Sequence, residues 1–133
     1  MTSTPIEAAR LLFRKAEHDL DAAKKLSIDG PLDIACYHFH QAVEKYIKAL
    51  LQAHDVEFPR THDLDALLDI CLSLGSDLES FRTPLESFIP YAIQLRYEWD
   101  YEPTAKEVSI ASHVADSVRA RILNLLPQLA DTL

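Results

Sequence analysis

Basic side chains at three places in the sequence could bind a phosphate group. Lys45 and Lys48 lie in one predicted helix, Arg60 follows it in a Phe-Pro-Arg-Thr turn, and Arg96 lies near the end of a later helix. Ammonium and guanidinium groups bind phosphate oxygens through charge-assisted hydrogen bonds. We therefore take these four cations as candidate ligand-binding residues.

Two further polar residues follow Arg96 closely. Tyr97 and Asp100 lie with it at a predicted helix end, where polar side chains can project into a cleft between subunits. A purely structural interpretation stands beside this one, because an Arg-Tyr pair near a helix end also packs against its neighbours and pairs with carboxylates. Arg96, Tyr97 and Asp100 complete the set of candidate site residues.

The spacing of the histidines does not predict a metal site. His38 and His40 are two residues apart, so on a helix their side chains point about 160° away from each other. His40 and Glu44 share a face, but two ligands without a third make a weak site. His54 and His62 flank a loop and belong to no metal-binding motif. We expect no metal and no cofactor, and interpret these histidines as flanking and capping residues.

Other classes of catalytic site are disfavoured by residue type. No serine or cysteine lies in a nucleophile motif, and two glycines in 133 residues cannot form a phosphate-binding loop. Cys36 and Cys71 occupy apolar helical positions, so we expect buried free thiols.

Composition predicts one helical domain over residues 1–133. Nearly half of the chain is apolar, which is enough for a core, and the scarcity of glycine argues against a turn-rich β protein. The net charge of −8 provides no bulk attraction to nucleic acid or to an anionic membrane. No apolar run approaches the ~18 residues of a membrane span, so we expect a cytoplasmic protein without a membrane partner.

Helix starts are predicted by three Thr-x-x-Glu patterns, which begin at Thr4, Thr83 and Thr104. With the 3.6-residue apolar period they define an antiparallel, up-and-down bundle of four to five helices. Pro90 should kink the fourth helix. The expected helices span residues 5–27, 31–54, 62–74, 84–99 and 105–126, with Thr61 capping the third.

The second predicted helix has a clear inner face. Its solvent side is expected to hold Glu44 and Lys48 as an exposed i,i+4 pair. Tyr37 and Leu51 lie outside the core arc, and together with the aromatic residues near Arg96 they predict a surface that a homodimer would cover. The inward positions are Ala35, Phe39, Ala42, Val43, Tyr46, Ile47 and Leu50.

Four segments resemble the signature of the HEPN family, named for nucleotide binding in higher eukaryotes and prokaryotes. They are residues 41–45 (QAVEK), 48–51 (KALL), 60–64 (RTHDL) and 95–97 (LRY). The resemblance implies a dimeric helical bundle and, in many members, a nucleotidyltransferase partner in a toxin–antitoxin-like pair.

The same resemblance implies metal-independent RNA cleavage in some members. Their motif is an Arg and a later His with four to six residues between them. Arg96 matches the Arg, but the three positions open to the His hold Tyr101, Glu102 and Pro103. Tyrosine titrates too high to replace it, and glutamate would add negative charge beside the phosphate. The chain is therefore interpreted as a member without the usual nuclease pair.

Three functions remain open from the sequence. The favoured one is a dimeric binding module for a nucleotide, an RNA or another phosphate-bearing ligand, or for a nucleotidyltransferase partner. The second is an RNA-cleaving toxin whose rearranged site recruits His40 or His62. The third is a structural oligomerisation unit without a ligand.

Overall fold

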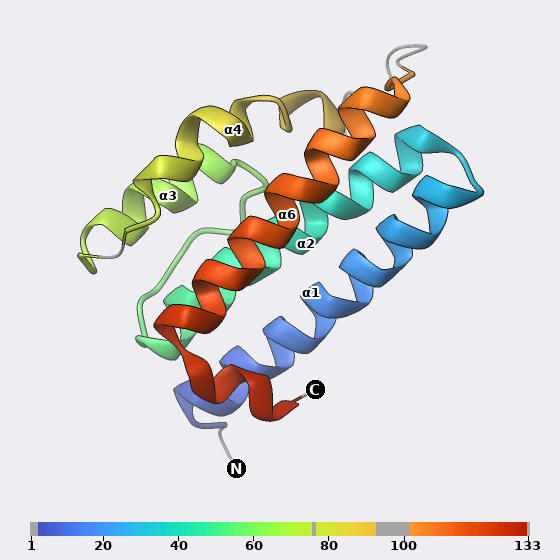
Figure 1. Cartoon of the computed structure of the whole chain (residues 1–133). Coiled ribbons are helices and arrows are strands. Elements are labelled where there is room, and N and C mark those ends of the chain that lie inside the picture. Colours follow the sequence, from blue (N-terminus) through green and yellow to red (C-terminus); the bar gives the residue numbers. More distant parts are fainter. Residues whose placement is uncertain (1–2, 76, 93–101, 133) are drawn as a thin grey trace.

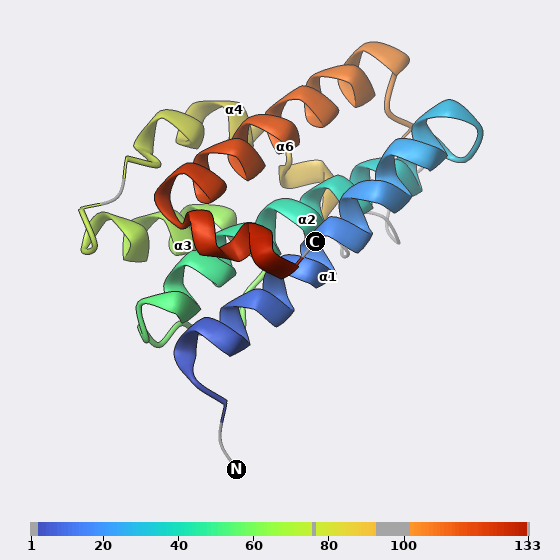
Figure 2. The ribbon, with the colours of Figure 1, turned by 60° about the horizontal axis from the view of Figure 1, so that its bottom comes forward.

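Three long helices form the frame of the computed structural model, which describes residues 3–75, 77–92 and 102–132. α1 (Pro5–Ile28), α2 (Leu32–Ala53) and α6 (Ala105–Leu125) lie side by side (Figure 1), and a second view shows the same arrangement (Figure 2). α2 runs opposite to α1, and α6 runs in the direction of α2. The described residues contain no strand, so the predicted all-α bundle is confirmed.

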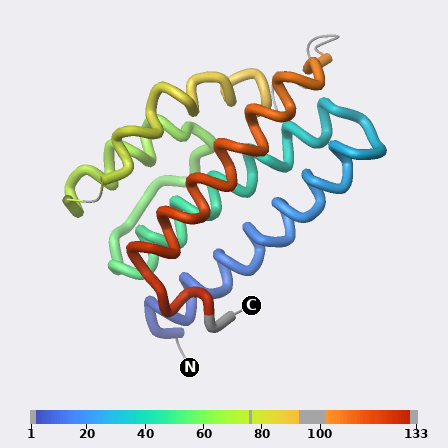
Figure 3. The backbone as a smooth tube through the Cα atoms, in the orientation of Figure 1, coloured from blue at the N-terminus to red at the C-terminus, as the bar shows by residue number. Residues whose placement is uncertain are grey.

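Shorter helical pieces cover the remaining side of α2. α3 (Leu64–Leu72) and α4 (Arg82–Glu86) follow a long loop that leaves the end of α2 (Figure 3). α3 packs on α2, as does the 3-10 turn η2 (Ile89–Tyr91). This layer and the loop before α3 provide most of the lining of the groove described below. Two further 3-10 turns are η1 (Glu79–Phe81) and η3 (Pro127–Thr132).

α2 is the central helix, and all seven of its predicted inward residues are buried. The prediction for Leu51 is wrong: it is 0% exposed and belongs to the core, which removes it from any subunit contact. Tyr37 is half-buried. Cys36 and Cys71 are buried free thiols as predicted, and burial raises the pKa of each to about 11.

Two of the three predicted helix caps are confirmed. The Thr4 side chain accepts a hydrogen bond from the Glu7 N–H, and Thr104 forms a full capping box with Glu107. These contacts satisfy N–H groups that the first helical turn leaves unpaired. All three long helices agree with prediction to within one residue at each end.

The predicted fourth helix is wrong in its start and its continuity. Thr83 lies inside α4, because η1 leads directly into that helix and the preceding Phe81 is already helical (φ −87°, ψ −10°). α4 then ends at Glu86. Pro90 has no N–H for the next ladder bond, and the chain continues as the 3-10 turn η2, so the α-helix is broken where a kink was expected. The rest of the predicted helix, residues 93–99, lies outside the described residues.

α3 begins two residues later than predicted, with a different cap. Asp63 Oδ1 accepts hydrogen bonds from the N–H groups of Asp65 (3.0 Å) and Ala66 (3.3 Å). Thr61 instead accepts a hydrogen bond from the Asp63 N–H, at 3.0 Å, and shapes the turn that leads into the helix.

In the part of the chain that the structure describes, no helix combines the length and the apolar character that a membrane crossing requires.

Candidate ligand groove beside α2

A groove of about 940 Å³ is lined by the loop after α2, by α3, α4 and η2, and by one residue of α2, His40. One part of its described lining is apolar, and the other carries charged and polar groups. Its volume lies in the range of small-molecule sites. The apolar residues are Leu64, Leu68, Leu85, Phe88, Ile89 and Ala92, and the polar ones are His40, Arg60, Thr61, His62, Asp63, Asp65, Arg82 and Glu86.

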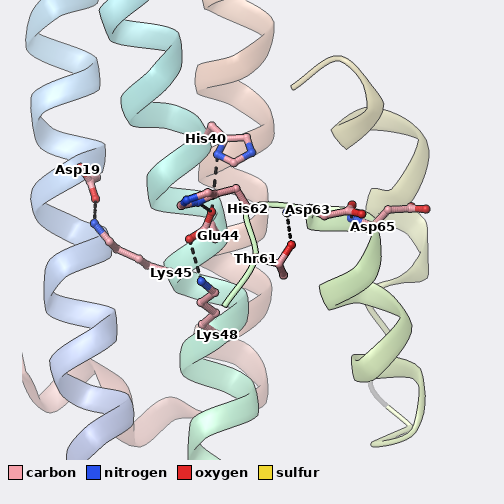
Figure 4. Close-up of polar contacts among 9 residues, drawn as sticks. All are labelled: Asp19, His40, Glu44, Lys45, Lys48, Thr61, His62, Asp63 and Asp65. Atoms are coloured by element: carbon pink, nitrogen blue, oxygen red, sulfur yellow. Dashed lines mark hydrogen bonds and ion pairs between the residues drawn. The ribbon is translucent and has the colours of Figure 1, made fainter. Parts of the chain in front are cut away.

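A buried carboxylate lies beside this groove. The side chain of Glu44 is only 4% exposed, and its two oxygens bind different side chains (Figure 4). Oε2 accepts a hydrogen bond from Lys48 Nζ at 2.9 Å, and Oε1 contacts His62 Nδ1 at 2.8 Å. Because buried charges are retained in proteins when they are paired, this arrangement accounts for a carboxylate in the interior.

The prediction that Glu44 and Lys48 form an exposed pair is therefore wrong. The loop after α2 folds back over this face of the helix and places His62 against Glu44 and the Phe58 ring under Lys48, with Nζ 5.8 Å from the ring centroid. The helical period predicted which side of α2 faces the core, but a second buried side exists because this loop covers it.

His40 lies one turn before Glu44 and is 2% exposed. Among the described residues its Nδ1 has no hydrogen-bond partner, and the Glu44 Oε1 is 4.0 Å away. Burial lowers the pKa of His40 below its ordinary value, and this effect outweighs the opposing influence of Glu44. His40 is thus a buried neutral imidazole, where a flanking residue was predicted. No group of three side chains in the described ranges has the arrangement of a metal site.

The two arginines of the groove differ in their partners. Arg82 forms ion pairs with Asp65, Asp69 and Glu79 at 2.6 to 2.8 Å, and its hydrogen bonds to Glu79 and Asp65 raise its pKa above the usual value. Arg60 is exposed and has no ion-pair partner among the described residues. Arg60 is therefore the guanidinium that the described structure leaves available to a ligand.

The structure brings only some of the predicted site residues together. Arg60 lines the groove. Lys48 does not line it, and its ammonium group binds Glu44, whose other oxygen contacts the lining residue His62. Lys45 does not line it, because its ammonium group pairs with Asp19 of α1. Arg96, Tyr97 and Asp100 lie outside the described residues, although Ala92, the last described residue before them, lines the groove.

Sequence reasoning did not identify Glu44 as part of the site. A usable signal was present: His40, Glu44 and Lys48 recur every four residues and therefore share one face of α2. That spacing alone did not show that a loop from outside the helix would cover the face.

A second carboxylate–imidazole pair lies between α1 and α2. His38 Nδ1 contacts Asp19 Oδ1 at 2.9 Å, and Lys45 binds the other oxygen of the same carboxylate. None of these three residues lines the groove. This cluster connects two long helices and provides an internal comparison for the Glu44 cluster.

Residues 9–125 match the family model of the HEPN domain. The chain is also similar to a protein of Methanocaldococcus jannaschii named "Putative toxin MJ1304", with 30% identity over 94 residues. That match covers 71% of this chain and 61% of the relative, so it spans less than two thirds of the relative's length. No solved structure matches the chain.

Proposed function

This chain belongs to the HEPN family, and we propose that it is a dimeric binding module whose groove beside α2 takes a phosphate-bearing ligand, either a nucleotide or a segment of RNA. The observation that carries the proposal is the pairing of Arg60, a cation without a described partner, with an apolar wall across the same groove. Phosphate would meet the guanidinium, and a flat base would pack on Ile89 and Ala92, the two apolar lining residues that are not buried.

Local charge supports this choice despite the net charge of −8. Arg82 already forms ion pairs with three carboxylates, so it stabilises the layer of α3 and α4 and does not compete with Arg60 for the ligand. Arg60 lies in a loop in which the next residues are fixed by hydrogen bonds. Thr61 and Asp63 accept them from backbone N–H groups of the turn, and His62 is bonded to Glu44. A preordered loop loses less conformational entropy on binding.

Thermal shift with matched ligands tests this proposal. AMP should raise the melting temperature in a concentration-dependent way, and adenosine should do so less because it lacks the phosphate. Arg60→Ala should remove most of the effect of AMP. Arg14→Ala deletes an equivalent exposed cation on α1, outside the groove, and should leave it intact. Equal shifts in the two variants would contradict the assignment.

We extend the proposal to a protein partner, a small nucleotidyltransferase in a toxin–antitoxin-like pair. The support is the family membership together with the name of the M. jannaschii relative, which is that of a toxin. Co-expression with the nucleotidyltransferase encoded nearest to this chain should yield a complex on size-exclusion chromatography. Light scattering of the chain alone should give the mass of a dimer. Separate elution of the two proteins would remove this extension.

RNA cleavage is a second candidate function, favoured by the bond between His62 and the buried Glu44. An imidazole held by a carboxylate is a common proton-transfer group. The purified protein would then cleave RNA in the presence of a metal chelator, and Arg96→Ala and His62→Ala would each abolish cleavage. An intact RNA substrate at high protein concentration rejects this candidate. If, in addition, no nucleotide changes the melting temperature, the remaining function is that of a structural oligomerisation unit.

A further inference from the structure

The hydrogen bond between Glu44 and His62 has a fixed direction. An ionised carboxylate only accepts hydrogen bonds, so Nδ1 of His62 is the donor in the 2.8 Å contact with Oε1. A neutral imidazole carries one proton, and when that proton is on Nδ1 the other nitrogen, Nε2, has a lone pair. Nε2 has no hydrogen-bond partner among the described residues, and 58% of the His62 side chain is exposed.

Lys48 makes this arrangement possible. Its ammonium group lies 2.9 Å from Glu44 Oε2 and is itself mostly covered, with 14% of the side chain exposed. The negative charge of Glu44 is therefore balanced by Lys48, a residue of the same helix, α2. A neutral imidazole can then complete the coordination of Oε1 through a single N–H.

We propose that Glu44 is a positioning residue: in the neutral form of His62 it holds the proton on Nδ1, so that Nε2 accepts a hydrogen bond from a hydroxyl group of the ligand in the groove. The inference rests on the proposed function for the existence of that ligand. It adds separate roles for Arg60 and His62 in binding the ligand, which the proposed function does not specify.

The separate roles of Arg60 and His62 follow from which of their atoms donate and which accept hydrogen bonds. Phosphate oxygens without a proton cannot bond to a lone pair, whereas Arg60 offers only N–H donors. Arg60 thus takes the phosphate, and His62, two residues later in the same loop, takes a hydroxyl. A ligand that satisfies both is a nucleotide with a free ribose hydroxyl. His40, at 2% exposed, is too deeply covered to take this role.

Nitrogen-15 NMR tests the positioning role without any ligand. In the neutral limit of a pH titration, His62 should show a protonated Nδ1 and an unprotonated Nε2. Glu44→Gln removes the charge but keeps the size, and it should shift the signals of His62 toward the Nε2–H form. Asp19→Asn makes the same change in the matched cluster, so it should move the signals of His38 and leave those of His62 unchanged. An Nε2–H form in the unmodified protein, or no shift in Glu44→Gln, overturns the proposal.

Calorimetric titration tests the hydroxyl assignment with AMP and 2′,3′-dideoxy-AMP as probes. The unmodified protein should bind AMP about fivefold more tightly, the contribution of one hydrogen bond. Glu44→Gln and His62→Phe should both lose this preference, whereas Arg60→Ala should weaken both probes equally. His62 is largely exposed, so His62→Phe carries this test if Glu44→Gln does not fold.

The outcomes separate the inference from the function it rests on. Equal affinity of the unmodified protein for both probes overturns the hydroxyl assignment while the binding function stands. Binding of neither probe refutes the binding function and with it the hydroxyl assignment, and the NMR signals of His62 then decide the positioning role of Glu44 alone.

Discussion

Replacing Glu44 with alanine removes the acceptor of two charge-assisted hydrogen bonds. The donors are Lys48 Nζ at 2.9 Å and His62 Nδ1 at 2.8 Å. Bonds to charged groups contribute about 1.5–3 kcal/mol each. The His62 bond counts for less, because that side chain is largely exposed and regains water. Lys48 is mostly covered, so its charge must either move into water or remain without its partner. We expect the free energy of unfolding to fall by about 2–3 kcal/mol.

Urea and thermal unfolding followed by circular dichroism measure this loss. For a chain of this size it corresponds to a melting temperature lower by about 10 °C. Asp21→Ala is the control, because it breaks an exposed i,i+4 pair with Lys25 and should cost less than about 0.5 kcal/mol. A similarly small loss for Glu44→Ala would refute the reasoning that this carboxylate fastens the loop to α2.

Three further predictions concern stability. Thr104→Ala should cost about 1 kcal/mol in denaturant unfolding, because it removes a helix cap, whereas Thr83→Ala should cost clearly less because Thr83 caps nothing. Leu51→Ala should cost about 2–5 kcal/mol by the same measurement, against less than about 0.5 kcal/mol for the exposed Leu11→Ala. The pKa of His40 is lowered in the folded state, so the unfolded chain binds its proton first as the pH falls. The contribution of neutral His40 to the free energy of unfolding should be complete above about pH 6.5 and should decrease below that pH. In melting experiments at a series of pH values, the melting temperature of His40→Gln should therefore fall less steeply with acid than that of the unmodified protein. An equally steep fall would contradict the burial of a neutral imidazole.

Local chemistry accounts for the parts of the fold that were predicted correctly. All seven residues that the apolar period of α2 placed inward are buried, and the capping threonines at positions 4 and 104 marked helix starts, because both signals depend on neighbours within a few residues. The same Thr-x-x-Glu pattern misled at Thr83. There the backbone is already helical in the preceding 3-10 turn, so Thr83 is not at a helix start. The Thr-x-x-Glu pattern contains no information about the conformation of the residues before it.

The candidate site was predicted only in part for a similar reason. Arg60 was named from its residue type and its turn, and the structure places it on the groove. Lys45 was named on the same grounds, but its partner is a carboxylate on another helix. Glu44 was assigned to solvent because a helical period describes one helix at a time. Its burial depends on a loop that returns from residues 58–62.

By itself, the amino-acid sequence determined that this chain forms helices, where the long ones begin and end, and which stripe of α2 packs in the core. Those properties follow from hydrogen bonding and side-chain spacing within a few turns. Only the tertiary structure decided that His62 meets Glu44, that Lys48 is covered, and that Arg60 stands beside a groove. Each of these depends on the path of a loop, and that path is set by contacts between residues distant in the chain, whose energies no local pattern encodes.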